Sequence, residues 1–149
     1  MDKSLALYYE RTTALIQMLR TSNLTLGVFE KATGTHIAHW RVLAFLAQHP
    51  DCTQKQLKDA HRVDPASITR TVKSLEREGL IARRTDEKDN RLTRVILTPA
   101  GEKLVAEVSV RRKAYMRQVL KGISPADIEV FEKVLKQVEG NALAMPRRK

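Results

Sequence analysis

The sequence of 149 residues has little cysteine, few aromatic residues and no long apolar run. Its one cysteine, Cys52, excludes a disulfide within the chain and is typical of proteins of the reducing cytoplasm. No apolar run approaches the ~20 residues that a membrane span needs, and no signal-peptide segment follows Met1. Aromatic residues make up 5% and hydrophobic residues 42%, which suits one compact, helix-rich domain. We therefore expect a cytoplasmic protein without a membrane partner.

The sequence also lacks the motifs of common enzyme classes. It has no glycine-rich phosphate loop, no H-E-x-x-H and no G-x-S-x-G, and its acidic residues are scattered over predicted helix surfaces. We therefore predict that the protein is not an enzyme and that it has no catalytic residue, no resident metal and no cofactor.

Basic residues, by contrast, are abundant. The chain has 27 Lys and Arg against 17 Asp and Glu, a net charge of +10 and a sequence pI of about 10.0. This surplus favours a polyanionic partner, because each phosphate that a cation neutralises releases condensed counterions. Charge alone leaves open a basic protein without a nucleic-acid partner, so the arrangement of the basic residues has to decide.

Residues 64–79, DPASITRTVKSLEREG, predict one helix of about four turns. Asp64 suits the N-cap, Pro65 suits the first helical position, and Gly79 can adopt the left-handed conformation that ends a helix. The apolar residues form one narrow stripe with helical spacing: Ile68, Val72 and Leu75. The remaining face mixes hydroxyls with basic side chains, which bind base edges and phosphates: Ser67, Thr69, Arg70, Thr71, Lys73 and Arg77.

The segment before this helix predicts a helix-turn-helix. Thr53 and Gln56 have the spacing of a capping box, which opens a short helix with Leu57 and Ala60 turned inward. Residues 61–63 then form a tight turn into the helix with the polar face.

The segment after this helix predicts a β-hairpin. Residues 81–84 and 94–97 are short β-prone runs on either side of a charged, turn-forming loop. The predicted fold class is therefore mostly α with a small β-hairpin wing, a winged helix-turn-helix in which the hairpin reaches a second part of the same duplex.

Four motifs in this order resemble the multiple-antibiotic-resistance-regulator (MarR) family of bacterial transcription factors. They are TQKQL from Thr53, the helix segment that runs on into LEREGLI, Asp-x-Arg at Asp89 to Arg91, and LTPAG from Leu97. Each motif alone is weak, but the ordered set, over roughly residues 38–105, is specific. The resemblance implies a winged helix-turn-helix that binds double-stranded DNA and acts most often as a repressor.

Side-chain chemistry and the resemblance together predict the DNA contacts. Arg70 is expected to read a guanine edge, and Pro65 and Ala66 to contact thymine methyl groups. The other residues expected to face the groove are Ser67, Thr69 and Lys73. Phosphate contacts are expected from Thr53, Lys55 and Arg77.

The resemblance also assigns roles in the wing. It implies that Arg91 enters the minor groove, where a narrow A·T tract has an enhanced negative potential, and that Asp89 holds the shape of the wing. Arg83, Arg84 and Arg94 are expected to add phosphate contacts.

Four helices are predicted outside the helix-turn-helix. The first covers residues 5–21, with an apolar segment at 24–30 that continues to a break at Gly34. A strongly apolar central helix covers residues 36–49. The last two run from Pro99 to about Lys121, ended by Gly122, and onward from Ser124-Pro125, which repeats the cap-and-proline start.

The first and last helices need a partner, because their apolar stripes lie outside the winged unit. The resemblance implies that this partner is a second copy of the chain in a homodimer, and the alternative is a monomer with these helices folded onto itself. The residues expected in that interface are Leu5, Tyr8, Ile128, Phe131 and Leu135. We predict a helical dimerisation region at 1–34 and 100–149 and a DNA-binding domain at 35–99, which the resemblance supports. A two-fold dimer would place two recognition helices about 34 Å apart on a palindromic operator.

The resemblance further implies that a small aromatic or phenolic anion binds near the dimer helices and weakens DNA binding. The candidate effector-binding residues are Arg20, His36, His39, Trp40 and His61. Trp40 also fits the apolar stripe of the central helix, which is a purely structural role.

Three alternatives stay open at this point. A metal-responsive regulator would use His36 and His39, at i and i+3, with His49 or Cys52, and a redox-responsive regulator would use Cys52. From another class, an architectural protein would bind DNA without reading its sequence. A winged-helix module that binds another protein is disfavoured by the charge of +10.

Overall fold

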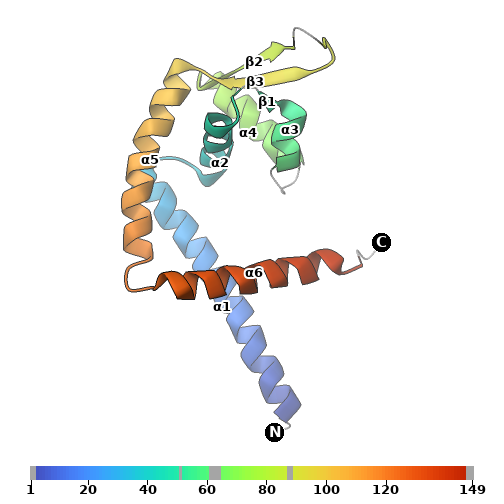
Figure 1. The fold of residues 1–149 in the computed structure, drawn as a ribbon, viewed down its shortest axis with the longest axis vertical. Helices are drawn as coiled ribbons and strands as arrows, with labels where there is room; N and C mark the ends of the chain where they lie inside the picture. Colours follow the sequence, from blue (N-terminus) through green and yellow to red (C-terminus); the bar gives the residue numbers. More distant parts are fainter. Residues whose placement is uncertain (1–2, 51, 61–64, 87–88, 147–149) are drawn as a thin grey trace. The chain divides into compact units, whose positions relative to one another are not determined.

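The computed structural model describes residues 3–50, 52–60, 65–86 and 89–146, except for the side chains of residues 3–11 and Pro65. Its described elements confirm the predicted fold class, with six helices and one small antiparallel sheet (Figure 1). The helices are α1 (Lys3–Thr33), α2 (Ile37–Gln48), α3 (Gln54–Ala60), α4 (Pro65–Arg77), α5 (Pro99–Val119) and α6 (Pro125–Ala144). The strands are β1 (Cys52–Thr53), β2 (Ile81–Thr85) and β3 (Thr93–Leu97).

The chain forms two compact units, Met1–Tyr115 and Met116–Lys149, which meet within α5. The first unit holds the winged helix-turn-helix with α1 and most of α5, and the second holds α6. No helix in the described part of the chain is both long and apolar enough to cross a membrane.

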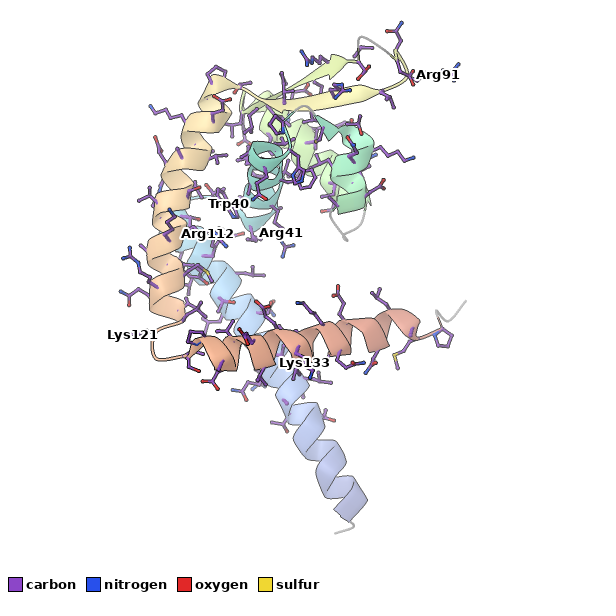
Figure 2. The ribbon with its side chains drawn as sticks, in the orientation of Figure 1. Trp40, Arg41, Arg91, Arg112, Lys121 and Lys133 are labelled. Carbon is purple, nitrogen blue, oxygen red and sulfur yellow. The ribbon has the colours of Figure 1, made fainter. Side chains whose placement is uncertain are left out.

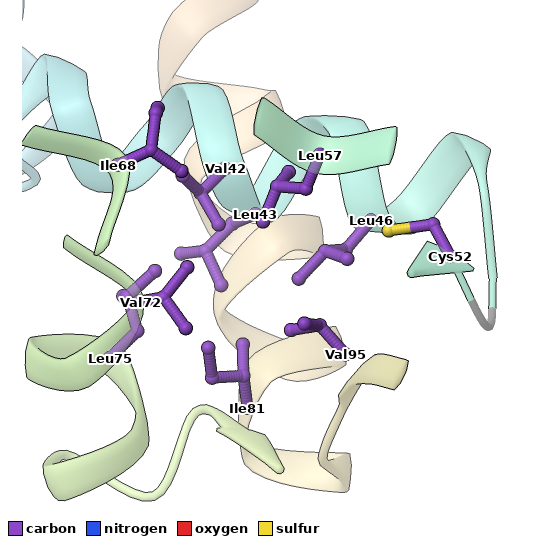
Figure 3. Packing of buried hydrophobic residues seen from close by; sticks show 10 residues of the cluster. All are labelled: Val42, Leu43, Leu46, Cys52, Leu57, Ile68, Val72, Leu75, Ile81 and Val95. Atoms are coloured by element: carbon purple, nitrogen blue, oxygen red, sulfur yellow. The ribbon is translucent and has the colours of Figure 1, made fainter. Parts of the chain in front are cut away.

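The core of the first unit lies where α2, α3, α4 and the sheet meet (Figure 3). Its members are all buried: Val42, Leu43, Leu46, Cys52, Leu57, Ile68, Val72, Leu75, Ile81 and Val95. The predicted α4 stripe is therefore confirmed as buried. On α2 the deepest side chains are Val42, Leu43 and Leu46, whereas Trp40 is only partly buried.

The sheet has the strand order β1-β3-β2, with both pairs antiparallel. The hairpin β2–β3 confirms the prediction, in a register from Ile81 opposite Leu97 to Thr85 opposite Thr93. Strand β1 was not predicted; Cys52 pairs with Val95 at the start of the helix-turn-helix. Two residues are too short to show a strand pattern, and only the tertiary pairing reveals this strand.

Helix α1 corrects one predicted boundary. We expected residues 5–21 to form the first helix, but α1 is continuous to Thr33 and passes through Gly27. It ends as predicted at Gly34, whose φ is +71°. The next helix, α2, is capped by the first, because Glu30 accepts the Ile37 N–H at 3.0 Å.

The second half of α1 packs against α5 within the first unit. The Tyr115 hydroxyl donates to the Thr25 carbonyl at 2.7 Å, and its ring meets Phe29 edge-on, with 5.6 Å between the ring centroids. Phe29 is buried, as is Val108 on α5. A hydrogen bond and an aromatic contact thus join α1 and α5, the long helices that flank the winged helix-turn-helix in the sequence.

The L-T-x-x-G motif forms the junction between the recognition helix and α5. Thr98 accepts the Gly101 N–H at 3.1 Å, which caps α5, and its hydroxyl donates to the Gly79 carbonyl at 2.6 Å. Gly101 lies so close to the preceding turn that an added Cβ would be 2.0 Å from the Leu80 carbonyl oxygen. Only glycine fits there, so the motif serves packing.

In the second unit, α6 begins as predicted. Ser124 accepts the Asp127 N–H at 3.1 Å, and Pro125 occupies the first turn. No residue of α6 is buried, and it exposes large apolar side chains that include Val130, Phe131 and Val134. The preceding stop at Gly122, with a φ of +82°, also follows the prediction.

Candidate nucleic-acid interface

Helix α4 is amphipathic and ends in a well-formed stop. Gly79 has a φ of +70° and donates to the Glu76 carbonyl at 3.0 Å, while Leu80 donates to the Leu75 carbonyl at 2.9 Å. These two bonds are the Schellman motif, which satisfies the last carbonyls of a helix. The predicted N-cap Asp64 lies outside the described residues. The closed C-terminal end fixes the direction in which α4 presents its polar side.

The outward face of α4 is basic. Arg70, Lys73 and Arg77 follow one another at i, i+3 and i+7 and are exposed. They line a hollow of about 630 Å³ with neighbours from α2, α4 and β2: His39, Thr71, Ser74, Glu76 and Arg83. An exposed basic row on one helix face is the electrostatic footprint of a phosphate-binding surface.

The small side chains of α4 differ from the prediction in how far they are exposed. Ser67 and Thr69 are partly buried, and Ala66 is exposed. Thr71, expected on the polar face, is 8% exposed and donates to the Ser67 carbonyl at 3.0 Å. The expectation for Thr71 was wrong because its position lies on the side of α4 that turns toward the core, and its hydroxyl is satisfied within the helix.

Arg83 forms a bidentate ion pair with Glu76, although we expected it to contact phosphate. Its guanidinium donates to both carboxylate oxygens, at 3.0 Å from Nε and at 2.5 Å from Nη2. These hydrogen bonds lower the pKa of Glu76, and the carboxylate in turn raises the pKa of Arg83. Because the pKa of Glu76 is lowered, the ion pair stabilises the folded state fully at pH values above 4.5, the ordinary pKa of a glutamate. This stabilisation is lost as the pH falls through the lowered pKa.

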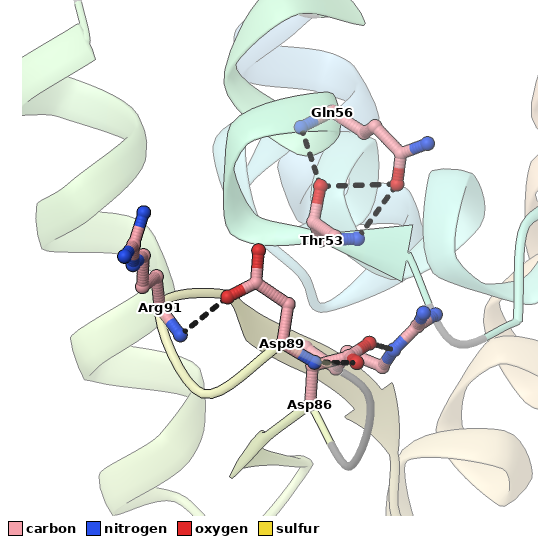
Figure 4. A network of polar contacts seen from close by, with 6 residues as sticks. Thr53, Gln56, Asp86, Asp89 and Arg91 are labelled. Carbon is pink, nitrogen blue, oxygen red and sulfur yellow. Dashed lines mark hydrogen bonds and ion pairs between the residues drawn. The ribbon is translucent and has the colours of Figure 1, made fainter.

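The start of α3 forms the predicted capping box (Figure 4). Thr53 accepts the Gln56 N–H at 3.1 Å, and Gln56 accepts the Thr53 N–H at 2.8 Å. The Thr53 hydroxyl is thus hydrogen-bonded within the capping box, whereas the nearby Lys55 side chain is exposed. Of the residues expected to turn inward, Leu57 is fully buried but Ala60 is exposed, which corrects that prediction.

The wing is shaped by two aspartates (Figure 4). Asp89 accepts the Arg91 N–H at 3.0 Å, and Asp86 accepts the Asp89 N–H at 2.9 Å. Asp86, 3% exposed, also forms an ion pair with Arg94. Asp86 was not predicted; the signal in the sequence was its spacing of three residues from Asp89, which suits an aspartate that caps a turn. Arg94 therefore holds the start of the wing loop, next to the last residues of the β2–β3 ladder, and its side chain is partly exposed.

Arg91 is an exposed cation of the wing, and Figure 2 shows it at the far end of the hairpin. Arg84 is also exposed and lies opposite Arg94 in the hairpin register. The first unit thus displays a basic helix face and an arginine-tipped hairpin, the two parts by which a winged helix-turn-helix contacts DNA.

Residues 36–93, from the start of α2 into β3, match the model of the MarR family. Over 138 residues the chain is 28% identical to the uncharacterized HTH-type transcriptional regulator YdgJ of Bacillus subtilis (strain 168), covering 92% of this chain and 84% of YdgJ. Residues 36–93 therefore form a MarR-type domain. The protein is a DNA-binding transcriptional regulator.

Solved structures agree with this assignment. A probable transcriptional regulator from Pseudomonas aeruginosa is 28% identical, with a TM-score of 0.73 over 81% of this chain and 93% of that one. BpsR of Bordetella bronchiseptica, whose DNA binding is regulated by 6-hydroxynicotinic acid, is 22% identical, with a TM-score of 0.73 over 85% of this chain and 98% of that one. At that identity BpsR supports the fold alone.

The predicted effector-binding residues do not form one cluster in the described part of the chain. His36 and His39 lie together, with 5.9 Å between ring centroids, and His39 also lines the hollow beside α4. Arg20 is exposed on α1, about 20 Å along the helix axis from Thr33, where α1 ends. His61 lies outside the described residues.

A second hollow in the first unit was not predicted. It has a volume of about 370 Å³ between the end of α2, β3 and the start of α5. Its lining is apolar apart from one carboxylate: Leu46, Ala47, Pro50, Ile96, Leu97, Glu102 and Val105. Such a size suits a small ligand.

The described residues give little support to a metal-responsive or a redox-responsive regulator. None of these residues form a group of three or more His, Cys, Asp or Glu side chains able to hold a metal ion. His49 stacks on Phe45, with ring centroids 4.2 Å apart, and Cys52 is buried in the core. A buried thiol is a poor redox sensor, because oxidants reach exposed thiolates first.

Proposed function

We propose that this regulator is a homodimeric repressor of the MarR family that reads a palindromic operator and is released from it by a small aromatic or phenolic ligand. The observation that carries the proposal is the basic row of α4, Arg70, Lys73 and Arg77, displayed with Arg91 at the wing tip. Arg70 is proposed to read a guanine edge and Arg91 to enter the minor groove.

The dimer is supported by apolar side chains that each unit exposes. In α1 these include Leu15, Ile16, Leu19 and Leu24, and in α6 they include Phe131 and Val134. Large exposed apolar faces of this kind mark interaction surfaces. We propose that residues 1–34 and 100–149 form the dimerisation region and that residues 35–99 form the DNA-binding domain.

We propose that the effector binds in the second, apolar hollow, between the end of α2, β3 and the start of α5. Its only charged lining residue, Glu102, would repel a carboxylate but can accept a hydrogen bond from a phenol. A phenolic ligand therefore fits this hollow better than an aromatic acid. BpsR, which has the same fold, is regulated by 6-hydroxynicotinic acid, which carries a carboxylate and a hydroxyl group on a pyridine ring.

Direct binding tests the proposal. The protein is titrated with a duplex from the region upstream of its own coding sequence and with a scrambled duplex of the same composition, at two salt concentrations. Each titration is repeated with a panel of phenols and aromatic acids, 6-hydroxynicotinic acid included. We expect the native duplex to bind at least ~1,000-fold more tightly than the scrambled one at physiological salt.

The outcomes separate the rival functions. Release of the native duplex by one ligand class supports the ligand-responsive repressor. Equal binding of both duplexes, with affinity set by salt alone, would contradict it in favour of the architectural protein, because phosphate contacts carry no sequence information.

A further inference from the structure

The C-terminal end of the recognition helix carries two carboxylates that differ in how they are neutralised. Glu76 is held by Arg83 in a bidentate pair. Glu78 is approached by His39 of α2, with 3.8 Å between His39 Nδ1 and Glu78 Oε2. Arginine is charged at every physiological pH, whereas a histidine changes charge near pH 6.5. One of the two acidic positions therefore has a permanent counter-charge and the other has a counter-charge that depends on pH.

His39 lies beside the proposed DNA contacts. It lines the same hollow as Arg70, Lys73 and Arg77, and its side chain is 20% exposed, so the ring is held in place but open to solvent. Glu78 is 43% exposed and is oriented by Ser74, whose hydroxyl donates to Glu78 Oε1 at 2.9 Å. A phosphate that approaches Lys73 and Arg77 meets a carboxylate next to them, and that carboxylate repels it unless His39 is charged.

We propose that His39 is a DNA-binding residue on the flank of the recognition helix, and that the proton it gains strengthens binding to the phosphate backbone. The proposal rests on the proposed DNA surface of α4 and adds a regulation that an effector does not supply. Deprotonated, His39 leaves Glu78 to repel phosphate. Protonated, it offsets the negative charge of Glu78, so the net charge beside the basic row rises by one.

Other charged groups near His39 set the strength of the effect. His36 lies 5.9 Å away between ring centroids and pairs with Glu30 at 3.3 Å, so a proton on His36 opposes one on His39 only in part. The groups that share the hollow with His39 are Arg70, Lys73, Glu76, Arg77 and Arg83. Bound phosphate would bring negative charge close to the ring, so we expect DNA to favour the protonated form of His39.

The sign of the pH dependence follows from linkage. Because the DNA complex favours the protonated ring, the affinity for DNA rises as pH falls through the histidine range. For two heads of a dimer we expect the dissociation constant of the wild type to fall roughly 10-fold from pH 8.0 to pH 5.5. The dependence of affinity on salt should steepen by up to about 2 in logarithmic slope, since about one more counterion per head is released.

The test compares single variants by fluorescence anisotropy with a labelled duplex at both pH values. His39→Gln keeps a polar side chain of similar size that cannot gain a proton. The change in the dissociation constant between the two pH values should therefore fall below about 3-fold. His39→Lys should bind at pH 8.0 as tightly as the wild type at pH 5.5. The matched control is His49→Gln, an exposed histidine at the other end of α2 that stacks on Phe45 and should leave the pH effect unchanged.

A second measurement follows the ring itself. The His39 resonance in the full-length protein is titrated with and without a duplex, and its pKa should rise on DNA binding, which a purely structural histidine would not show. A pH effect that survives in His39→Gln, or a His39 pKa that DNA leaves unchanged, would overturn the proposal. Equal binding to native and scrambled duplexes would instead overturn the specific repressor, because the His39 effect depends on phosphate and persists on either duplex.

Discussion

At the scale of single residues, Gly101 shows how a motif of the DNA-binding family serves packing. The turn after α4 brings the Leu80 carbonyl over the first turn of α5, where it accepts the Thr98 N–H at 3.1 Å. Gly101 lets this carbonyl approach, because any side chain would occupy the same space. The glycine thus fixes how α5 leaves the winged domain.

Substitution of Gly101 by alanine should destabilise the protein strongly. The new Cβ would lie 2.0 Å from a backbone oxygen, so α5 or the turn has to move. We expect a loss of roughly 3 kcal/mol in the free energy of unfolding, measured by urea titration. Gly140→Ala in α6, where nothing lies within 4 Å of the added Cβ, is the control and should be neutral or slightly stabilising. Equal stability of the two variants would contradict the close approach.

The basic residues show what a sequence leaves open at this scale. Arg70, Arg83 and Arg94 look alike as candidates for phosphate contact, since each follows or lies within the recognition element. The structure shows that Arg83 pairs with Glu76 and Arg94 with Asp86. These pairs join residues seven and eight positions apart across turns, so their distances depend on the folded turn rather than on local sequence.

At the scale of elements, helix ends are where the sequence analysis was most accurate. The stops at Gly34, Gly79 and Gly122 and the caps at Thr53 and Ser124 all form as expected. They depend on contacts within about four residues, which local sequence encodes. The length of α1 was underestimated because Gly27 and the polar residues before Leu24 weaken the local pattern, while packing of Phe29 against Tyr115 holds the helix.

The capping box gives a prediction for one element. Thr53→Ala removes the acceptor of the Gln56 N–H and should cost about 1 kcal/mol of stability, since α3 is only seven residues long and depends on its cap. Thr53→Ser keeps the hydroxyl and should retain most of the stability. Thermal unfolding of the three proteins measures both effects; an alanine variant as stable as the serine variant would show that the box contributes nothing.

At the scale of the whole molecule, α6 needs a partner that the single chain does not provide in its own unit. No residue of α6 is buried, and Phe131 and Val134 are 54% and 53% exposed. Their stripe continues through the partly buried Ile128 and Leu135. A second copy of the chain with the same stripe would cover both faces at once, as an isologous interface requires.

Replacing Phe131 by glutamate should therefore weaken the proposed dimer. Each two-fold interface loses the side chain twice, so the dissociation constant should rise roughly 100-fold or more. Light scattering coupled to gel filtration over a dilution series measures the change. Gln137→Glu, on the polar face of α6 next to Asn141, adds the same charge and should leave the dimer intact. A wild type that stays monomeric at high concentration would contradict the dimer itself.

The sequence by itself determined the order of the elements, the buried stripe of α4, the helix caps and the wing, because these depend on spacing and contacts between near neighbours. Only the tertiary structure decided that Arg83 and Arg94 pair with carboxylates, that Thr71 is buried, that β1 joins the sheet, and that His39 lies beside Glu78. Each of these depends on residues from different elements meeting in space, and no local pattern of residues records such a meeting.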